Sequence, residues 1–286
     1  MSVSIAAIIV TYNRLELLKE TLSSIQSQSL PLTEIVVINN SSTDGTLEWL
    51  NTQKNITVIT QRNVGGAGGF ATGIDYAYSH GHDWIWCMDD DVVPMHDCLE
   101  NLIKLQSDIL IRTPLRHEVG SSTEPQDTIE FNFSNPFKSL WQRMFSSKEI
   151  TNRSYIEAEG ITFEGPLIHR KVVETIGLPD TGFFIFADDS DYFIRAKKHG
   201  FVSIIVFSAK MERKIHYSLD RPTSWKLYYG LRNMILLDMR YGNLAVKFFR
   251  PTLYFLKMFF TARSNSERLL IFKGYWHGIF QKTGKL

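Results

Sequence analysis

The chain has 286 residues, of which 44% are hydrophobic and 21% charged, and its formal net charge at pH 7 is +1. These values predict a globular protein, either one large domain or one domain with an appendage, and exclude a disordered chain. Two cysteines cannot form a disulfide framework, no signal peptide is recognisable, and no run reaches the about 18 apolar residues of a membrane span, so we expect a cytoplasmic protein.

Strand and helix signals alternate through the first part of the chain. Short, mostly apolar runs predict buried strands at Ile5–Val10, Glu34–Ile38, Ile56–Thr60 and Trp84–Met88. A helical pattern follows each of these strands. The first helix is expected to begin with a capping box of Asn13 and Glu16, and the second with Ser42 or Thr43 as its cap. The third is expected to begin near Phe70, and the fourth after Asp97. This order predicts an α/β fold with a doubly wound, mainly parallel sheet, in which ligands bind at the carboxyl ends of the strands.

Polar residues stand at the expected carboxyl end of each strand. The clusters are Thr11-Tyr12-Asn13, Asn39-Asn40-Ser41, Arg62-Asn63 and Asp89-Asp90-Asp91. One such cluster is ordinary for a loop, but four at one edge of a sheet indicate a binding site.

The three adjacent aspartates need something that balances their charge. Neighbouring carboxylates repel each other, and a divalent cation turns this repulsion into coordination. Asp89 and Asp91 have the spacing to reach one Mg²⁺ or Mn²⁺ ion together with a diphosphate. The alternative is a solvated acidic turn that caps the next helix. The glycine patterns of a calcium loop and of a dinucleotide-binding loop are absent where those sites would need them, so both are disfavoured.

A glycine-rich stretch, RNVGGAGGFATG, extends from Arg62 to Gly73. Glycines let the backbone come close to a ligand, and Arg62 is a candidate partner for an anion. Because the stretch precedes a helix and accompanies the aspartate cluster, we expect it to contribute to the same site.

A second acidic group lies further along the chain. The apolar run Phe183–Phe186 leads directly to Asp188 and Asp189. Burial beside this run would raise the pKa of one carboxyl toward the range that suits a general base. The alternative role is capping of the helix expected at Ser190–His199, and Asp191 can serve that helix while Asp189 faces the site.

Other elements of the second half are a helix at His169–Ile176, a strand at Val202–Phe207 and a helix at Trp225–Tyr241. Residues 117–155 are polar and irregular, which predicts a long loop of the kind that forms lids or binding elements. His216 follows the last strand. A lone histidine is usually structural, and only the nearby acidic groups make it a candidate metal ligand.

The last 46 residues, Tyr241 to Leu286, combine basic and aromatic side chains. They contain eight Lys and Arg against Glu267 alone, so their net charge is +7. Basic residues interleaved with aromatics suit an anionic membrane surface. The alternative is a terminal pair of helices that packs on the core and keeps a solvated basic face.

Six ordered blocks of the sequence resemble motifs of the inverting glycosyltransferases of family two, which have the GT-A fold. The blocks are IIVTYNR, VVINNSSTDGT, NVGGAGGF, DDD, GPLIHRKVVETIGLPDTGFFIFADDSDYFIRA and WKLYYGLRN, between Val3 and Asn233. Within that family the sequence looks most like bacterial galactofuranosyltransferases, with rhamnosyltransferases close by. The resemblance implies a GT-A domain at 1–240, with a nucleotide-sugar half (1–116) and an acceptor half (117–240), followed by a basic aromatic helical tail (241–286).

The resemblance also implies roles for individual residues. The residues that would bind the donor are Thr11, Tyr12, Asn13, Asn39, Arg62, Asn63, Gly68, Gly69 and Asp90. The metal would be bound by Asp89, Asp91 and His216. The acceptor would be bound by Asp188 and Asp189, with Asp189 as the catalytic base. Many members carry an aspartate at the position of Asn39, where it accepts the N3–H of uracil. An amide oxygen can accept the same bond, so uridine or thymidine recognition is retained.

The implied activity is metal-dependent transfer of a sugar with inversion of configuration. The expected donor is UDP-galactofuranose, and the acceptor is a hydroxyl of a glycan or lipid-linked glycan in bacterial cell-surface polysaccharide biosynthesis, such as O-antigen. Such an enzyme would work at the inner face of the cytoplasmic membrane and bind it through residues 241–286. It would not bind nucleic acid, and it could form a homo-oligomer. The alternatives are a dTDP-rhamnose-dependent rhamnosyltransferase, a haloacid-dehalogenase-type phosphatase and a non-catalytic sugar-nucleotide binder.

Overall fold

The computed structural model describes residues 3–105, 108–118, 127–150, 152–215 and 224–286, and its first part alternates strands and helices. The elements are β1 (Ile5–Thr11), α1 (Leu15–Gln26), β2 (Glu34–Asn39), α2 (Thr46–Leu50), β3 (Thr57–Thr60), α3 (Gly65–Ser79), β4 (Trp84–Asp89), β5 (Val92–Pro94) and α4 (Cys98–Lys104). The four strands predicted from apolar runs are confirmed to within one residue at each end.

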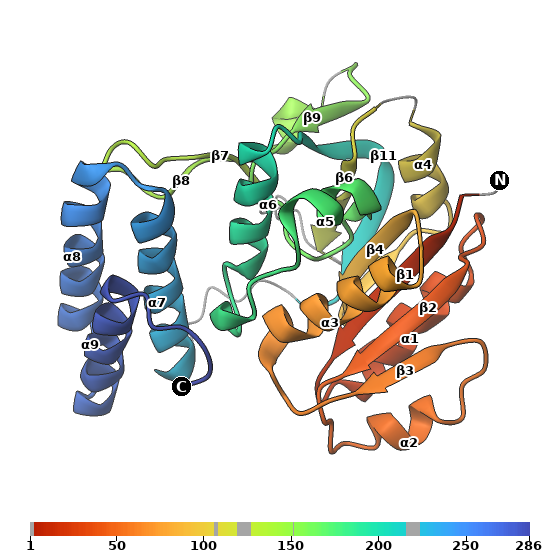
Figure 1. The fold of residues 1–286 in the computed structure, drawn as a ribbon, viewed down its shortest axis with the longest axis horizontal. Helices are drawn as coiled ribbons and strands as arrows, with labels where there is room; N and C mark the ends of the chain where they lie inside the picture. The colour runs from red at the N-terminus through yellow and green to blue at the C-terminus, as the bar shows by residue number, and fades with distance from the viewer. Residues whose placement is uncertain (1–2, 106–107, 119–126, 151, 216–223) are drawn as a thin grey trace.

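The second part begins with strands and ends with helices. Its elements are β6 (Ile111–Glu118), β7 (Thr128–Phe131), β8 (Trp141–Met144), η1 (Ser147–Glu149), β9 (Tyr155–Glu157), β10 (Leu167–His169), α5 (Arg170–Ile176), η2 (Thr181–Phe183), α6 (Asp188–Lys198), β11 (Ser203–Arg213), α7 (Ser224–Tyr241), α8 (Leu244–Phe260) and α9 (Asn265–Ile279). Figure 1 shows α7, α8 and α9 grouped at the left, beside the α/β part that contains the large sheet.

One nine-stranded sheet runs through the α/β part in the order β3-β2-β1-β4-β10-β6-β11-β5, with β9 also paired to β11. Strands β3, β2, β1 and β4 are parallel neighbours, and β6 is parallel to β11. Strands β10, β5 and β9 pair in the antiparallel sense. The predicted mainly parallel, doubly wound sheet is therefore confirmed.

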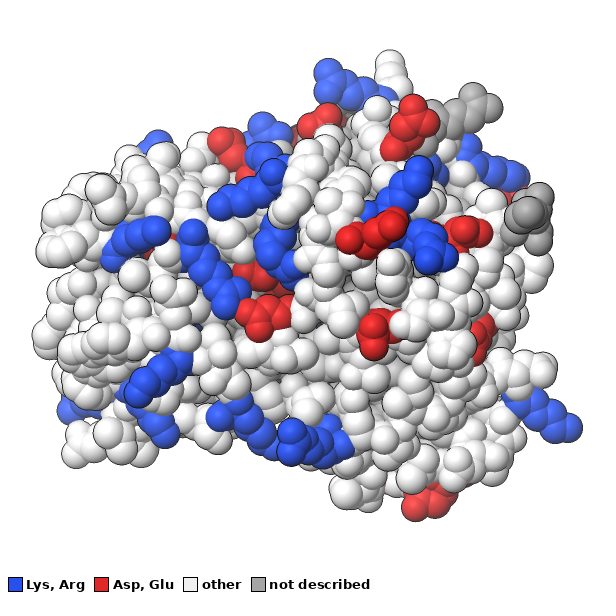
Figure 2. Space-filling view, in the orientation of Figure 1, with Lys and Arg blue, Asp and Glu red and all other residues white. Residues whose placement is uncertain are grey.

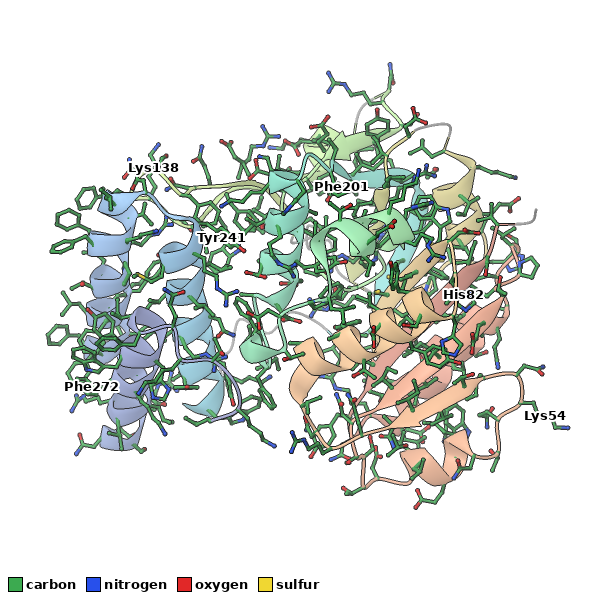
Figure 3. The ribbon with its side chains drawn as sticks, viewed as in Figure 1. Lys54, His82, Lys138, Phe201, Tyr241 and Phe272 are labelled. Atoms are coloured by element: carbon green, nitrogen blue, oxygen red, sulfur yellow. The ribbon has the colours of Figure 1, made fainter. Side chains whose placement is uncertain are left out.

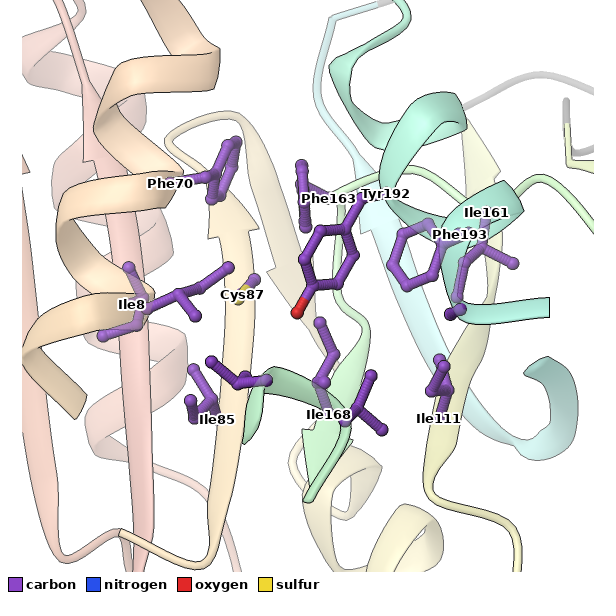
Figure 4. Close-up of a cluster of buried hydrophobic side chains, with 14 of the residues drawn as sticks. Ile8, Phe70, Ile85, Cys87, Ile111, Ile161, Phe163, Ile168, Tyr192 and Phe193 are labelled. Carbon is purple, nitrogen blue, oxygen red and sulfur yellow. The ribbon is translucent and has the colours of Figure 1, made fainter. Parts of the chain in front are cut away.

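Both faces of the sheet are buried, which explains why its strands are apolar throughout. Along β1, Ala6, Ile8 and Val10 belong to the hydrophobic cluster under α3 and α6, while Ile5, Ala7 and Ile9 belong to the cluster under α1 and α4. This alternation follows from the two-residue period of a strand. Figure 4 shows the first cluster, with Phe70 of α3 and Tyr192 of α6 packed over Cys87 of β4.

Helix α3 begins at Gly65, so the expectation of a glycine-rich loop before a helix near Phe70 is wrong. A Cβ atom on Gly73 would lie 2.2 Å from Ile8 Cγ2, and one on Gly69 would lie 2.4 Å from Val10 Cγ1. Most of the glycines thus belong to a helix that packs very close to β1. Side chains at these positions would clash with the strand and prevent this close packing. Tertiary packing overrides the low helix propensity of glycine here.

The starts of α1 and α2 are capped from a residue that the sequence patterns did not indicate. Asp44 accepts hydrogen bonds from the N–H of Leu15 (3.0 Å) and from that of Thr46 (3.3 Å). Asn13 makes no capping box; its side-chain oxygen accepts the N–H of Thr43 at 2.7 Å. One carboxylate thus serves the first turns of two helices, where negative charge is favourable.

The long loop expected at residues 117–155 is only partly present. Strand β6 extends to Glu118, and β7 and β8 form a separate two-stranded antiparallel sheet. Residues 119–126 and 151 lie outside the part of the chain that the structure describes.

The C-terminal helical unit, which we define as α7, α8 and α9, has a small core of its own. Leu231 and Ile235 of α7 pack with Ile271 of α9, and Tyr254 and Phe255 of α8 lie against them. Arg250 of α8 is fully buried, with its Nε 2.9 Å from Asp238 Oδ2 of α7. Part of the basic, aromatic tail therefore serves packing, as the alternative interpretation of the sequence expected.

Candidate active site

The aspartate cluster lies at the carboxyl end of β4, in the turn before β5. Parallel pairing aligns Val10 with Asp89 and Thr11 with Asn39. The polar residues predicted to follow β1, β2 and β4 therefore share one edge of the sheet, as expected for parallel strands.

Asp90 and Asp91 are both buried, and their charge is partly balanced by Arg14. The Nη1 atom of Arg14 lies 3.1 Å from Asp90 Oδ1 and 3.2 Å from Asp91 Oδ2. The hydroxyl of Thr11 donates to Asp90 Oδ2 at 2.7 Å. Sequence reasoning did not single out Arg14, although it belongs to the quoted block IIVTYNR. Asp90 is thus fixed by protein groups, whereas Asp91 Oδ1 is buried and has no hydrogen-bond partner among the described residues.

Burial raises the pKa of all three aspartates of the cluster. Asp91 and Glu164 add repulsion that raises the pKa of Asp89 further. Burial and then Glu164 raise the pKa of Asp91 to about 6, against the lowering effect of Arg14. The cluster therefore holds excess negative potential, which a cation would relieve.

Glu164 is a buried acidic residue that the sequence patterns did not indicate. It is hydrogen-bonded to Arg116 of β6, and its Oε1 lies 3.1 Å from Arg213 Nη2 of β11. Arg116 also binds Asp127, with 2.6 Å between Nη2 and Oδ1. The signal available in the sequence was a glutamate in the otherwise apolar stretch ITFEGPLI. Its partners stand far away in the chain, so sequence spacing could not reveal the network.

The second acidic group opens α6. Burial, with repulsion from Asp189, raises the pKa of Asp188 to about 8. Burial raises the pKa of the half-buried Asp189 to about 6, opposed by the N–H of Ser190, which donates to Asp189 Oδ1 at 2.6 Å. Glu164 contributes to the raised pKa of Asp89, Asp91 and Asp189 alike. The repulsion from Glu164 therefore reaches both acidic groups, which are about one hundred residues apart in sequence.

Asp191 has a different environment from its two neighbours. It is fully buried and accepts hydrogen bonds from Arg195 Nε (3.0 Å), Arg240 Nη1 (2.9 Å) and the hydroxyl of Tyr241 (2.6 Å). This network connects the first turn of α6 to α7. Among the described ion pairs, Asp188 and Asp189 of the same turn have no basic partner.

The residues predicted to bind a donor occupy varied environments. Asn39 is fully buried, and its amide oxygen accepts the N–H of Ser42 at 3.0 Å. Tyr12 and Arg62 are exposed, and Asn63 Oδ1 accepts the N–H of Gly65 at 2.9 Å, which caps the start of α3.

Gly68 and Gly69 lie inside α3 and face Val64 and Val10, so packing accounts for these glycines without a ligand. A donor contact of either glycine stays a prediction. His216, the predicted metal ligand, falls outside the described residues.

A cavity of about 840 Å³ lies away from these groups. It is lined by residues of β9, by Lys197 of α6 and by Phe201–Ser203 at the start of β11. Because β11 runs in the same direction as β4, its start is at the opposite edge of the sheet from Asp89. This cavity is therefore not part of the candidate site.

Comparisons with known proteins agree with this geometry. The family model described as "Glycosyl transferase family 2" matches residues 6–177. Two curated relatives are named galactofuranosyltransferase GlfT1. The protein of Mycolicibacterium smegmatis is 26% identical over 202 residues, and that of Mycobacterium tuberculosis 27% over 213 residues. The matches cover 68% and 70% of this chain but only 66% of each relative, slightly less than two thirds of its length.

Two solved structures share the fold. GalNAc-T7, with UDP, GalNAc and Mn²⁺, superposes with a TM-score of 0.61 at 16% identity, over 87% of this chain and 54% of that one. The mannosyltransferase PcManGT of Pyrobaculum calidifontis, in complex with GDP-Man and Mn²⁺, has a TM-score of 0.58 at 15% identity, over 97% and 87% of the chains. The expected GT-A type of fold is confirmed by this similarity.

Proposed function

Because the chain belongs to glycosyltransferase family 2, we propose that it transfers galactofuranose from UDP-galactofuranose to a hydroxyl of a glycan or lipid-linked glycan acceptor, with inversion of configuration. The observation that carries the proposal is that one buried residue, Glu164, raises the pKa of Asp89 and Asp91 after β4 and that of Asp189 at the start of α6, which links the two acidic groups. The relatives named galactofuranosyltransferase support the donor sugar. Cell-surface polysaccharide biosynthesis is the setting that we infer for this reaction.

Asp89 and Asp91 would hold a Mn²⁺ or Mg²⁺ ion. The buried, unpartnered Oδ1 atom of Asp91 and the raised pKa of both carboxyls fit a cation at this place. The described residues contain no group of three or more His, Cys, Asp and Glu close enough to bind a metal, so the remaining ligands would be His216, phosphate oxygens or water. When bound, the ion neutralises the charge that develops on the departing diphosphate. The two similar structures that hold Mn²⁺ support the choice of metal.

Asp189 would act as the general base. It takes the proton of the acceptor hydroxyl while that oxygen bonds to the anomeric carbon, and the bond from this carbon to the diphosphate oxygen breaks on the opposite face. UDP leaves with the bonding electrons, and one displacement inverts the configuration. Asp188, which keeps its proton at neutral pH, can hydrogen-bond an acceptor hydroxyl without repelling it.

The nucleoside would lie against the carboxyl ends of β1 and β2. Thr11, Tyr12, Asn13 and Asn39 would form this part of the site, with Asp90, held by Thr11 and Arg14, turned toward ribose or sugar. Arg62 and Asn63, at the start of α3, would lie near the diphosphate, where a helix N-terminus favours negative charge.

We further propose that residues 241–286 bind an anionic membrane surface, which would hold the enzyme at the cytoplasmic face beside a lipid-linked acceptor. On α8, Leu244 is 86%, Phe248 77% and Phe260 78% exposed. Glu267, the only acidic residue of this region, is buried. In Figure 2 the side of the molecule formed by α8 and α9 is mostly uncharged, with scattered Lys and Arg. Among the described helices, none is both long and apolar enough to cross a membrane.

A donor screen tests the proposed activity. Calorimetric titration in Mn²⁺ would compare UDP-galactofuranose, dTDP-rhamnose, UDP-galactose and UDP-N-acetylglucosamine. We expect UDP-galactofuranose to bind most tightly and to release UDP when octyl glycosides of common hexoses are supplied as acceptors. Preference for dTDP-rhamnose would establish the rhamnosyltransferase alternative, and release of inorganic phosphate without sugar transfer would refute a transferase.

A further inference from the structure

The segment that leads into Asp188 and Asp189 has an unusual backbone. Phe184, Phe186 and Ala187 have φ values of 65°, 66° and 62°, in the left-handed region that residues other than glycine rarely adopt. Such conformations persist only where surrounding groups hold them, and they concentrate at functional sites. Ala187 is also the N-cap of α6, so its conformation sets the direction in which the first turn of the helix leaves.

One side chain of α7 binds most of the carbonyl groups in this segment. Asn233 Nδ2 lies 3.1 Å from Phe183 O, 2.7 Å from Ile185 O and 2.8 Å from Phe186 O. An amide nitrogen has two hydrogens, so at least one of them is shared between two carbonyls. Asn233 is fully buried, where leaving these carbonyls unpaired would be costly.

The neighbouring residue fixes the orientation of this amide. Arg232 Nε donates to Asn233 Oδ1 at 2.7 Å, which turns the amide nitrogen toward the carbonyls. The guanidinium also donates to Gly182 O (3.0 Å) and Phe183 O (2.6 Å), and to Gly284 O after α9 (2.5 Å). Gly284 N–H in turn donates to Gly182 O at 2.6 Å.

The same segment touches the start of α3 on its other side. Phe184 O accepts the N–H of Ala67 at 3.3 Å, and a Cβ atom on Gly65 would lie only 1.9 Å from that oxygen. The segment is therefore enclosed between the helix that begins beside the candidate diphosphate site and the helix that carries Asn233.

We propose that Asn233, oriented by Arg232, is a positioning residue that sets the place of the catalytic carboxylate by holding the left-handed backbone before it. The inference rests on the proposed role of Asp189. Beyond the segment, Arg240 and Tyr241 of α7 bind Asp191 in the same helical turn, so α7 holds the chain on both sides of Asp188 and Asp189. A displacement of about 1 Å at a reacting group can cost 10²-fold in rate.

Asn233→Asp in the full chain tests this role, because the shape is kept while the donor becomes an acceptor that repels three carbonyls. Asn243→Asp is the matched control, since Asn243 Nδ2 also donates to a carbonyl (Ser134 O, 2.9 Å) and its side chain caps α8 rather than binding the segment before Asp188. Assays would follow UDP release from UDP-galactofuranose with Mn²⁺ and octyl glycoside acceptors. We expect kcat to fall about 10²-fold only in Asn233→Asp, with the Kd of UDP within about threefold of wild type.

Hydrogen exchange gives a readout that does not depend on activity. Amides of residues 183–190 should exchange faster in Asn233→Asp than in Asn243→Asp, with equal exchange in the strands β1 and β4. Unchanged kcat in a folded Asn233→Asp protein, or a parallel loss of UDP affinity, would overturn the proposal.

A second variant covers failure of the first to fold. Arg232→Lys keeps the charge but cannot bridge the amide and the carbonyls, and it should lower kcat in the same way. If neither variant folds, these contacts serve folding and the positioning role is refuted. A wild-type protein that is inactive with UDP-galactofuranose refutes the donor instead, and the comparison is then made with the sugar nucleotide that the wild type uses.

Discussion

Asp188 and Asp189 are adjacent in the chain, but the first turn of α6 gives them different surroundings. Burial raises the pKa of Asp188 to about 8 and that of Asp189 to about 6. At pH 7 the pair therefore holds about one proton, mainly on Asp188, because two close carboxylates do not ionise independently. The ionised member is Asp189, which is the state that a general base needs.

Asp189→Asn should lower kcat by about 10²–10⁴-fold, because the amide cannot accept the proton of the acceptor hydroxyl. The Kd of UDP in Mn²⁺ should stay close to that of the wild type. In the wild type, kcat/KM should fall below about pH 6, where the carboxylate becomes protonated. Steady-state rates from pH 5 to 9 measure both effects. A larger loss of kcat in Asp188→Asn than in Asp189→Asn would exchange the two roles.

Asp188→Asn should make the protein more stable at alkaline pH. Because the pKa of Asp188 is raised on folding to about 8, the folded state binds more protons than the unfolded chain between the ordinary aspartate pKa and pH 8. The contribution of this residue to the free energy of unfolding therefore falls as pH rises through that window. Asparagine is neutral and has no such dependence. Melting curves should show the Tm of the variant rising above that of the wild type as pH increases from 5 to 8.5, and a constant difference would contradict the shift.

Asp91→Asn should remove the effect of the metal on nucleotide binding. In the wild type, Mn²⁺ and UDP together should raise Tm more than the sum of their separate effects, because each binds better in the presence of the other. The variant lacks the carboxylate whose Oδ1 is unpartnered, so this synergy and turnover should both be lost. Asp97→Asn, which changes an exposed aspartate a few residues away, is the control. Full synergy in Asp91→Asn would remove Asp91 from the metal site.

At the scale of elements, the buried strands were predictable because burial on both faces leaves a continuous apolar run in the sequence. The start of α3 was not, because glycine is a poor helix former and its value here lies in contacts with Ile8 and Val10. The dual cap made by Asp44 was missed for a related reason. It acts through space on the first turn of α1, 29 residues away from Leu15 in the chain.

Substitution of the glycines of α3 tests this explanation. Gly73→Ala should destabilise the protein by about 1–3 kcal/mol, since overpacking against Ile8 outweighs the helix propensity of alanine, about 1 kcal/mol. The same change at Gly66, in the same helix, meets no atom within 4 Å. Gly66→Ala should therefore be neutral or slightly stabilising. Denaturant unfolding of both variants gives the comparison, and equal effects would show that packing on β1 is not what requires glycine.

At the scale of the whole molecule, the candidate site depends on contacts that no local pattern reveals. The network of Glu164 with Arg116 and Arg213 joins three separate parts of the chain. Similarly, the boundary predicted at 240/241 falls inside α7, before its last residue Tyr241. Helices α7, α8 and α9 pack together around Leu231, Ile235 and Ile271. Because α7 also holds the segment before Asp188, removal of residues 242–286 would disturb the site as well as the tail.

Membrane binding is therefore better tested by surface substitutions than by truncation. The exposed face of α8 is largely apolar: Leu244, Phe248 and Phe260 are largely exposed, together with the basic Lys257. Phe137 stands beside Phe249 (6.2 Å between ring centroids) and extends this face, and Figure 3 places Phe272 of α9 at the outer edge of the same helical unit. Burial of a phenylalanine contributes about 1.5–3 kcal/mol, against about 1 kcal/mol for a basic residue near an anionic bilayer. Insertion of the phenylalanines should thus outweigh the attraction of the charges.

The wild type and two variants of the 286-residue chain separate these contributions in co-sedimentation with phosphatidylglycerol and phosphatidylcholine vesicles. The wild type should prefer anionic vesicles at low salt, and at high salt its binding to them should fall to the level of its binding to neutral vesicles. Phe248→Ser with Phe260→Ser should abolish binding to both lipids, because about 3–6 kcal/mol of insertion is lost. Lys257→Gln with Lys273→Gln should weaken binding only to anionic vesicles and only at low salt, by about 2 kcal/mol. Failure of the wild type to bind either vesicle, together with a concentration-dependent dimer that the phenylalanine variant lacks, would identify this face as a contact between two copies of the chain.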